Sequence, residues 1–164
     1  MTHVATVLVC TGDDWTAREL DLRGMEDVDS VADAVRDELG SDGPAVMFVE
    51  EDDEYFVALR LDNIDADPRV FLSDVRAVDT SELAAMLYGE AEEDVELDEE
   101  DTDEDAPPLD VEPGGDDTVF ADLGTTAADL RALCSAKGML PSDVIATLCE
   151  RAGCGEAWEE LRLA

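Results

Sequence analysis

Histidine and cysteine, the residues best suited to metal binding and nucleophilic catalysis, are few in this chain and poorly spaced for either role. The single histidine is His3, and Cys134, Cys149 and Cys154 contain no Cys-x-x-Cys pair that would indicate a zinc site. Cys134 and Cys149 recur with apolar residues at helical spacing, which predicts core positions. Cys154, between two glycines, is expected to be the most accessible of these thiols. We predict no disulfide and no bound metal.

The acidic tract from Asp101 onwards matches a calcium-binding loop only superficially. Carboxylates occupy the first, third and fifth positions, and Glu112 occupies the twelfth. The sixth position is Ala106 instead of glycine, and two prolines follow it, so the sharp turn of such a loop is not available. The chain also lacks a nucleophile elbow and a glycine-rich phosphate loop followed by lysine. We therefore predict that the chain is not an enzyme and binds no cofactor.

The charge of the chain favours a basic protein partner. Its 164 residues include 45 acidic and 10 basic ones, for a net charge of -35. Residues 1–89 carry 22 acids and 6 arginines (net -16), 90–117 carry 16 acids and no base (net -16), and 118–164 carry 7 acids and 4 bases (net -3). Nucleic acids and anionic membranes are bound through Lys and Arg clusters, so direct binding to either is disfavoured. Solubility or adaptation to high salt would explain the charge equally well.

Hydrophobic periodicity divides residues 1–89 into alternating strands and helices. The expected strands cover 4–10, 15–22, 45–49, 55–61 and 69–72, and the expected helices cover 27–40 and 81–87. The first two strands are separated by a turn signal and should form a hairpin. The resulting order, ββαβββα, predicts an α+β domain with a small, mainly antiparallel sheet that carries its two helices on one face.

The remaining residues are expected to form a linker and a second, smaller unit. Residues 90–117 are acidic and rich in proline and glycine, which predicts a disordered linker. Residues 118–164 are expected to form a small helical module with helices at 127–136, 141–152 and 156–163. A module of this size is near the lower limit for independent stability.

No stretch of the chain approaches the roughly 18 apolar residues of a membrane span. The first residues also lack the basic-then-apolar order of a signal peptide. We therefore expect a cytoplasmic protein that does not enter a membrane.

Several short stretches follow one another in a distinctive order. They are Tyr55-Phe56-Val57, Leu72-Ser73-Asp74-Val75, the acidic tract 90–117, Ala121-Asp122-Leu123-Gly124, Leu133-Cys134, Pro141, and the stretch from Gly153 to Trp158. In this order, over nearly the full chain, they resemble the actinobacterial family called tRNA adenosine deaminase-associated proteins. The resemblance implies association with the enzyme that converts the wobble adenosine of a tRNA to inosine. That enzyme class needs His-x-Glu and Pro-Cys-x-x-Cys, and this chain contains neither.

Two functional hypotheses remain open. The first is a non-enzymatic accessory protein that contacts the basic surface of a tRNA adenosine deaminase or another RNA-handling protein. The alternative is a self-assembling or small-molecule-sensing α+β module unrelated to RNA editing, of unknown oligomeric state. Candidate interaction residues are Leu72, Ser73 and Asp74, at the end of a strand, and Trp158 near the C-terminus. A plain strand-to-loop junction and a core tryptophan would account for the same residues.

Overall fold

A computed structural model describes residues 3–11, 14–22, 24–25, 27–38, 44–51, 54–63, 67–79, 81–92, 113–135 and 140–163. Within these residues, six strands form one antiparallel sheet in the order β2-β1-β3-β4-β5-β6. The elements, in chain order, are β1 (His3–Thr11), β2 (Asp14–Leu20), α1 (Val28–Glu38), β3 (Ala45–Glu51), β4 (Tyr55–Leu61), β5 (Arg69–Leu72), the 3-10 helix η1 (Val75–Asp79), α2 (Glu82–Glu92), β6 (Gly114–Gly115), the 3-10 helix η3 (Ala121–Leu123), α3 (Ala127–Ser135), α4 (Pro141–Ala152) and α5 (Gly155–Leu163). The predicted α+β class and the ββαβββα order are confirmed.

Ordered elements extend into both ends of the stretch expected to be a linker. At its start, α2 continues to Glu92, and near its end β6 pairs with β5. Gly115 has φ +90°, and a Cβ there would clash with the carbonyl oxygen of Val70, so only glycine allows this close pairing. The acidic composition of the stretch concealed this strand. The predicted disorder falls on residues 93–112, which lie outside the described residues.

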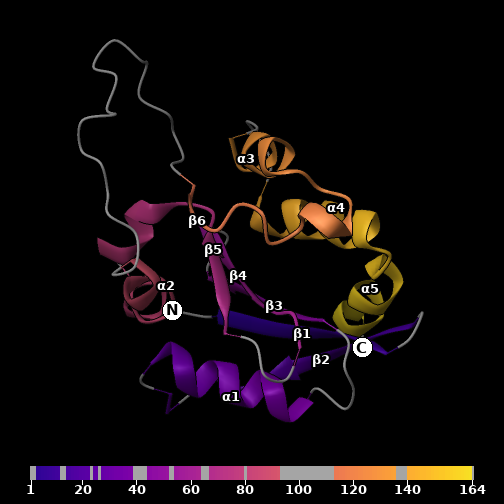
Figure 1. Ribbon diagram of the computed structural model, residues 1–164, viewed down its shortest axis with the longest axis horizontal. Coiled ribbons are helices and arrows are strands. Elements are labelled where there is room, and N and C mark those ends of the chain that lie inside the picture. Colours follow the sequence, from indigo (N-terminus) through magenta and orange to yellow (C-terminus); the bar gives the residue numbers. More distant parts are fainter. Residues whose placement is uncertain are drawn as a thin grey trace.

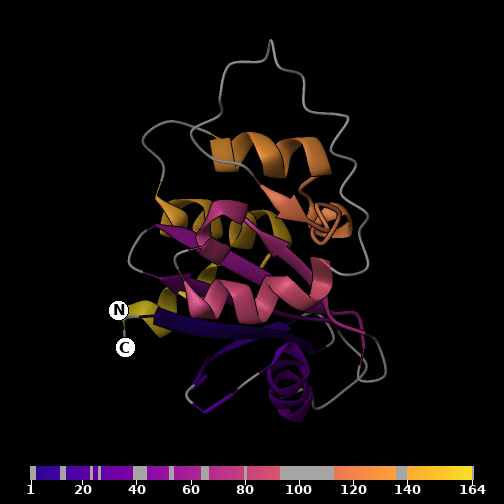
Figure 2. The same cartoon turned by 90° about the vertical axis from the view of Figure 1, so that its left-hand side faces the viewer.

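The sheet is covered by helices on both faces (Figures 1 and 2). One face packs against α1 and α2, as expected from the sequence of the first 89 residues, and the other packs against the helices of the C-terminal segment. Strand β4 shows the result most clearly because all seven of its residues are buried. Its Tyr55, Val57, Leu59 and Leu61 face α1 and α2, while Phe56 and Ala58 face the opposite side. Strands buried on both faces lack a polar side.

The C-terminal segment and the sheet share one hydrophobic core. Phe48, Phe56 and Phe71 from the sheet join residues of α3, α4 and α5 in it. Phe120, which follows β6, lies parallel to Phe48, with ring centroids 5.5 Å apart and an interplanar angle of 10°. Residues 118–163 therefore obtain much of their buried surface from the sheet, which accounts for how so short a helical segment becomes stable.

A buried arginine holds the start of the C-terminal segment on the sheet. The side chain of Arg60, in β4, is 5% exposed. Its Nη1 donates a hydrogen bond to the carbonyl oxygen of Val119 (2.6 Å), and the guanidinium binds both carboxylate oxygens of Asp122, with Nη2 2.7 Å from Oδ2. Its Nε lies 2.8 Å from a carboxylate oxygen of Asp62. The hydrogen bond from Arg60 holds the pKa of Asp122 below its ordinary value.

A second arginine, in the neighbouring strand β5, also binds the start of the C-terminal segment. Arg69, in β5, binds the carboxylate of Asp116 through Nε (2.7 Å) and the hydroxyl of Thr118 through Nη2 (2.7 Å). Burial disfavours the charged form of Asp116, yet hydrogen bonds from Arg69 and Thr118 still hold its pKa below the ordinary value. Residues 116–122 are thus bound to the sheet by two arginines.

We expect Asp122→Asn to lower the free energy of unfolding by about 1–3 kcal/mol, because it leaves the buried Arg60 guanidinium with only one of its two carboxylate partners, Asp62. Urea denaturation at pH 7 measures the change. Since the folded pKa of Asp122 is lowered, the charge contribution is present above the unfolded pKa of about 3.9 and is lost as the pH falls further. The gap between wild type and variant should therefore close in acid.

Asp129→Asn is the matched control, because Asp129 is about as exposed as Asp122 but pairs, at 3.7 Å, with Arg151, whose side chain is 39% exposed whereas that of Arg60 is 5% exposed. We expect a change within about 0.5 kcal/mol for this variant. Equal effects of the two substitutions would mean that the Arg60 contact contributes no more than a surface ion pair.

Candidate functional site

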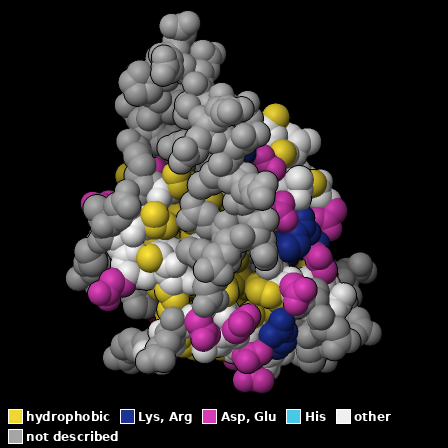
Figure 3. All heavy atoms as spheres, turned by 60° about the vertical axis from the view of Figure 1, so that its left-hand side comes forward, with side chains coloured by type: hydrophobic (Ala, Val, Ile, Leu, Met, Phe, Trp, Pro, Cys, Tyr) yellow, Lys and Arg dark blue, Asp and Glu magenta, His cyan; other side chains and the backbone are white. Residues whose placement is uncertain are grey.

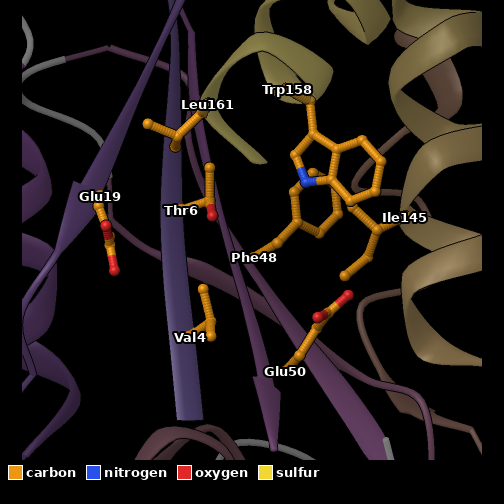
Figure 4. Close-up of a pocket in the computed structure, with 8 residues that line it drawn as sticks. All are labelled: Val4, Thr6, Glu19, Phe48, Glu50, Ile145, Trp158 and Leu161. Atoms are coloured by element: carbon orange, nitrogen blue, oxygen red, sulfur yellow. The ribbon is translucent and has the colours of Figure 1, made fainter. Parts of the chain in front are cut away.

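A pocket of about 310 Å³ lies between the sheet and the last two helices (Figure 4). Strands β1, β2 and β3 supply one side of it, and α4 and α5 supply the other. Its lining residues are Val4, Thr6, Glu19, Phe48, Glu50, Ile145, Trp158 and Leu161. We call it the acidic pocket, because two of these residues are glutamates and none of the described lining residues is Lys or Arg.

The antiparallel register brings the strand residues of the acidic pocket together. Thr6 in β1 pairs with Glu19 in β2 on one side and with Phe48 in β3 on the other. Val4 pairs with Glu50 in β3. Direct partners in antiparallel strands point to the same face of the sheet, so these five side chains share one surface.

Two local signals place the helical wall of the acidic pocket. Pro141 occupies the first turn of α4, and Gly153, with φ +92°, ends that helix in a left-handed conformation. The chain then turns back into α5, so that Ile145 of α4 and Trp158 of α5 face the same part of the sheet. Figure 4 shows the indole of Trp158 beside the ring of Phe48, with Ile145 next to both.

The two glutamates approach the acidic pocket from opposite sides of β1. Figure 4 shows Glu19 on one side of Val4 and Thr6 and Glu50 on the other. Neighbouring strands lie about 4.8 Å apart and each residue advances about 3.4 Å along a strand, so the backbones of Glu19 and Glu50, two strands and two residues apart, are separated by roughly 12 Å. Two carboxylates beside apolar walls of low polarisability create a negative potential that attracts a cation and repels phosphate.

The candidate residues expected from the sequence lie in two separate places. Leu72 is fully buried in the core towards α1 and α2. Ser73 is 6% exposed, its hydroxyl accepts a hydrogen bond from the Phe56 backbone N–H (2.9 Å), and its own N–H donates to the Phe56 carbonyl (3.0 Å). Asp74 is half-buried, and its carbonyl accepts a hydrogen bond from Ala77 N–H. Trp158 lies on the other face of the sheet and lines the acidic pocket.

Sequence reasoning missed Glu19 and Glu50, which were hidden among the 45 acidic residues of the chain. One feature of the sequence could have indicated these two residues. Glu19 falls on the same alternating face of its strand as Trp15 and Ala17, and Glu50 on the same face as Phe48. Glu50 is half-buried on the apolar side of its strand, which is unusual because burial of a charge is costly unless it has a function or a partner, whereas Glu19 is exposed on the edge strand.

The cysteines are free thiols, and three of them are buried. The expectation that Cys154 is accessible is wrong, since it is only 4% exposed. The turn at Gly153 folds α5 back onto α4, and the Cys154 N–H donates a hydrogen bond to the Cys149 carbonyl (2.8 Å). Burial raises the pKa of Cys134 to about 12, and the hydrogen bond with the Cys154 thiol, together with burial, raises the pKa of Cys149. Because only the thiolate is nucleophilic, a thiol whose pKa is raised in this way is mostly protonated and unreactive near neutral pH.

The described arginines already have acidic partners. Each arginine whose side chain the structure describes lies within 4 Å of a carboxylate: Arg18, Arg36, Arg60, Arg69, Arg131 and Arg151. In Figure 3, the visible basic side chains accordingly lie among acidic ones.

Among the residues that the structure describes, no group of three or more His, Cys, Asp or Glu residues is arranged to hold a metal ion. No described helix is long and apolar enough to cross a membrane.

Comparison with family models gives a match over most of the chain. A family model described as Rv3753c-like tRNA adenosine deaminase-associated protein matches residues 3–155. Neither a curated protein nor a solved structure matches the chain.

We expect a thiol reagent such as Ellman's reagent to modify the folded protein at pH 8 rapidly at Cys10 alone, because Cys10 is half-buried and the other three thiols are buried. Unfolding in urea should expose all four. In a Cys10→Ser variant, the rapid phase should disappear. A rapid phase that persists in this variant would mean that the turn between α4 and α5 opens readily.

Proposed function

The chain belongs to the Rv3753c-like tRNA adenosine deaminase-associated protein family, and we propose on that premise that it is a non-enzymatic accessory protein that binds the deaminase in the cytoplasm. The resemblance noted in the sequence is confirmed by the family match. The family description calls its members associated with the deaminase and does not describe them as the deaminase itself. The lack of the zinc and catalytic sequences of that enzyme in this chain supports an accessory role.

The observation that carries the proposed binding mode is the charge. An enzyme that edits tRNA must present a basic surface to the phosphate backbone. A chain with a net charge of -35, whose described arginines are all engaged with its own carboxylates, is attracted to such a surface. Contact with RNA is not part of the proposal. Instead, the chain and tRNA would compete for overlapping basic regions of the deaminase.

Self-assembly is a second candidate, favoured by the position of β2. This strand lies at one edge of the sheet, where a strand of a second molecule could pair with it. Two molecules of net charge -35 repel each other, however, and β2 itself carries Asp14, Arg18 and Glu19. Charged side chains along an edge oppose such pairing. We therefore favour the accessory function.

We expect the purified chain to bind the tRNA adenosine deaminase of the same organism with an affinity that falls at least tenfold when salt is raised from about 50 to 300 mM, because the screening length then drops well below 10 Å. Biolayer interferometry measures this affinity. Added tRNA should displace the chain. The absence of a complex at low salt would contradict the proposal, and a salt-insensitive complex would contradict its electrostatic basis.

We expect the mass of the isolated chain, measured by light scattering at low salt, to be that of a monomer of 17.7 kDa. Charge repulsion at a long screening length should prevent edge pairing under this condition. A dimer at low salt would transfer support to the self-assembly candidate.

A further inference from the structure

We propose that the acidic pocket binds the side chain of one arginine presented on the surface of a partner protein. The identification of that partner as the deaminase rests on the function proposed above. The capacity of the pocket for a guanidinium group rests on its own geometry and can be tested separately.

The placement of the two carboxylates suits a planar cation. Glu19 and Glu50 lie on strands that flank β1, and their backbones are roughly 12 Å apart. A guanidinium carries N–H donors on more than one edge and can therefore bind carboxylates on two sides at once. A lysine ammonium is a compact, strongly hydrated charge, which makes it a poorer fit to a partly apolar site.

The remaining walls suit the rest of an arginine side chain. Trp158, Phe48 and Ile145 form an aromatic and aliphatic surface beside the carboxylates. Guanidinium groups stack on aromatic rings, and the methylene stem of arginine packs on apolar surface. Val4 lines the same pocket and is 46% exposed, so a docked partner would also cover apolar surface that now faces solvent.

The volume and the charge of the acidic pocket together restrict which other ligands it could bind. About 310 Å³ is at the lower end of the range of roughly 300–1,000 Å³ typical of small-molecule sites, so the pocket suits one side chain better than a larger ligand. Glu19 and Glu50 would repel the phosphates of a nucleotide. An uncharged group of the same shape could still donate hydrogen bonds to the carboxylates but would lack the ionic attraction, so it should bind more weakly.

The first test uses N-acetyl-arginine amide as the probe and its neutral analogue N-acetyl-citrulline amide as the control. Both are titrated into the full ¹⁵N-labelled chain while NMR follows the indole N–H signals of Trp158 and Trp15. We expect a saturable shift of the Trp158 signal in the millimolar range with the arginine probe and at least tenfold weaker binding of the citrulline probe. Equal binding of the two probes, or no saturable shift with arginine, would overturn the proposal.

The second test compares two variants that remove the same amount of charge. Glu19→Gln/Glu50→Gln alters the acidic pocket, whereas Asp29→Asn/Asp37→Asn alters exposed residues of α1 on the opposite face of the sheet. We expect only the first pair to weaken arginine binding, by at least fivefold, with far-UV circular dichroism unchanged in both. Equal weakening by the two pairs would show a general effect of net charge and would overturn the proposal.

The same variants separate this proposal from the function on which it rests. If wild type binds the deaminase, the pocket variant should lose at least tenfold in affinity relative to the α1 variant. Equal losses of affinity in the two variants would be consistent with the accessory function but would exclude the acidic pocket from the interface with the deaminase. If wild type binds arginine but not the deaminase, the accessory function fails, and with it the assignment of the partner, while the guanidinium specificity of the pocket is retained.

Discussion

The arrangement of the whole C-terminal segment depends on the buried guanidinium of Arg60. A charge at this position is costly unless it is paired, and its partners, Val119 and Asp122, come from the segment that follows the acidic tract. Once this segment is bound, Phe120 is held against Phe48, and the next helices cover the same face of the sheet. The acidic pocket exists only because α4 and α5 end up there. The ionic contact of Arg60 and the packing that forms the proposed binding site thus hold the same segment on the sheet.

The fold uses its few positive charges internally. Arg18 in β2 lies 3.5 Å from Glu38 at the end of α1, and Arg131 in α3 lies 2.6 Å from Asp117. Arginines that already lie beside a carboxylate of the same chain are less attractive to phosphates than unpaired ones. The surplus of carboxylates then dominates the field outside the molecule. The same excess of carboxylates thus pairs with the arginines within the fold and supplies the negative charge for the proposed binding to a basic partner.

The elements and the family could be predicted from the sequence, because their signals are local. Alternation in 55–61, Pro141 at the start of α4 and Gly153 at its end each act within a few residues. The acidic pocket could not be predicted in this way. It depends on the register between β1, β2 and β3 and on a core shared by segments far apart in the chain, and neither leaves a local pattern. β6 was missed because two glycines in an acidic stretch have the composition of a linker.

The two elements on either side of residues 93–112, α2 and β6, both belong to the folded body. Gly114 of β6 lies against Tyr88 of α2. The entropic cost of closing a loop rises only logarithmically, by about 0.6 kcal/mol for each doubling of its length. From this relation we expect a change in the number of residues between α2 and β6 to alter the stability of the fold very little. Evolution could then change the length and charge of the chain between these two elements to suit a partner while the described elements keep their structure.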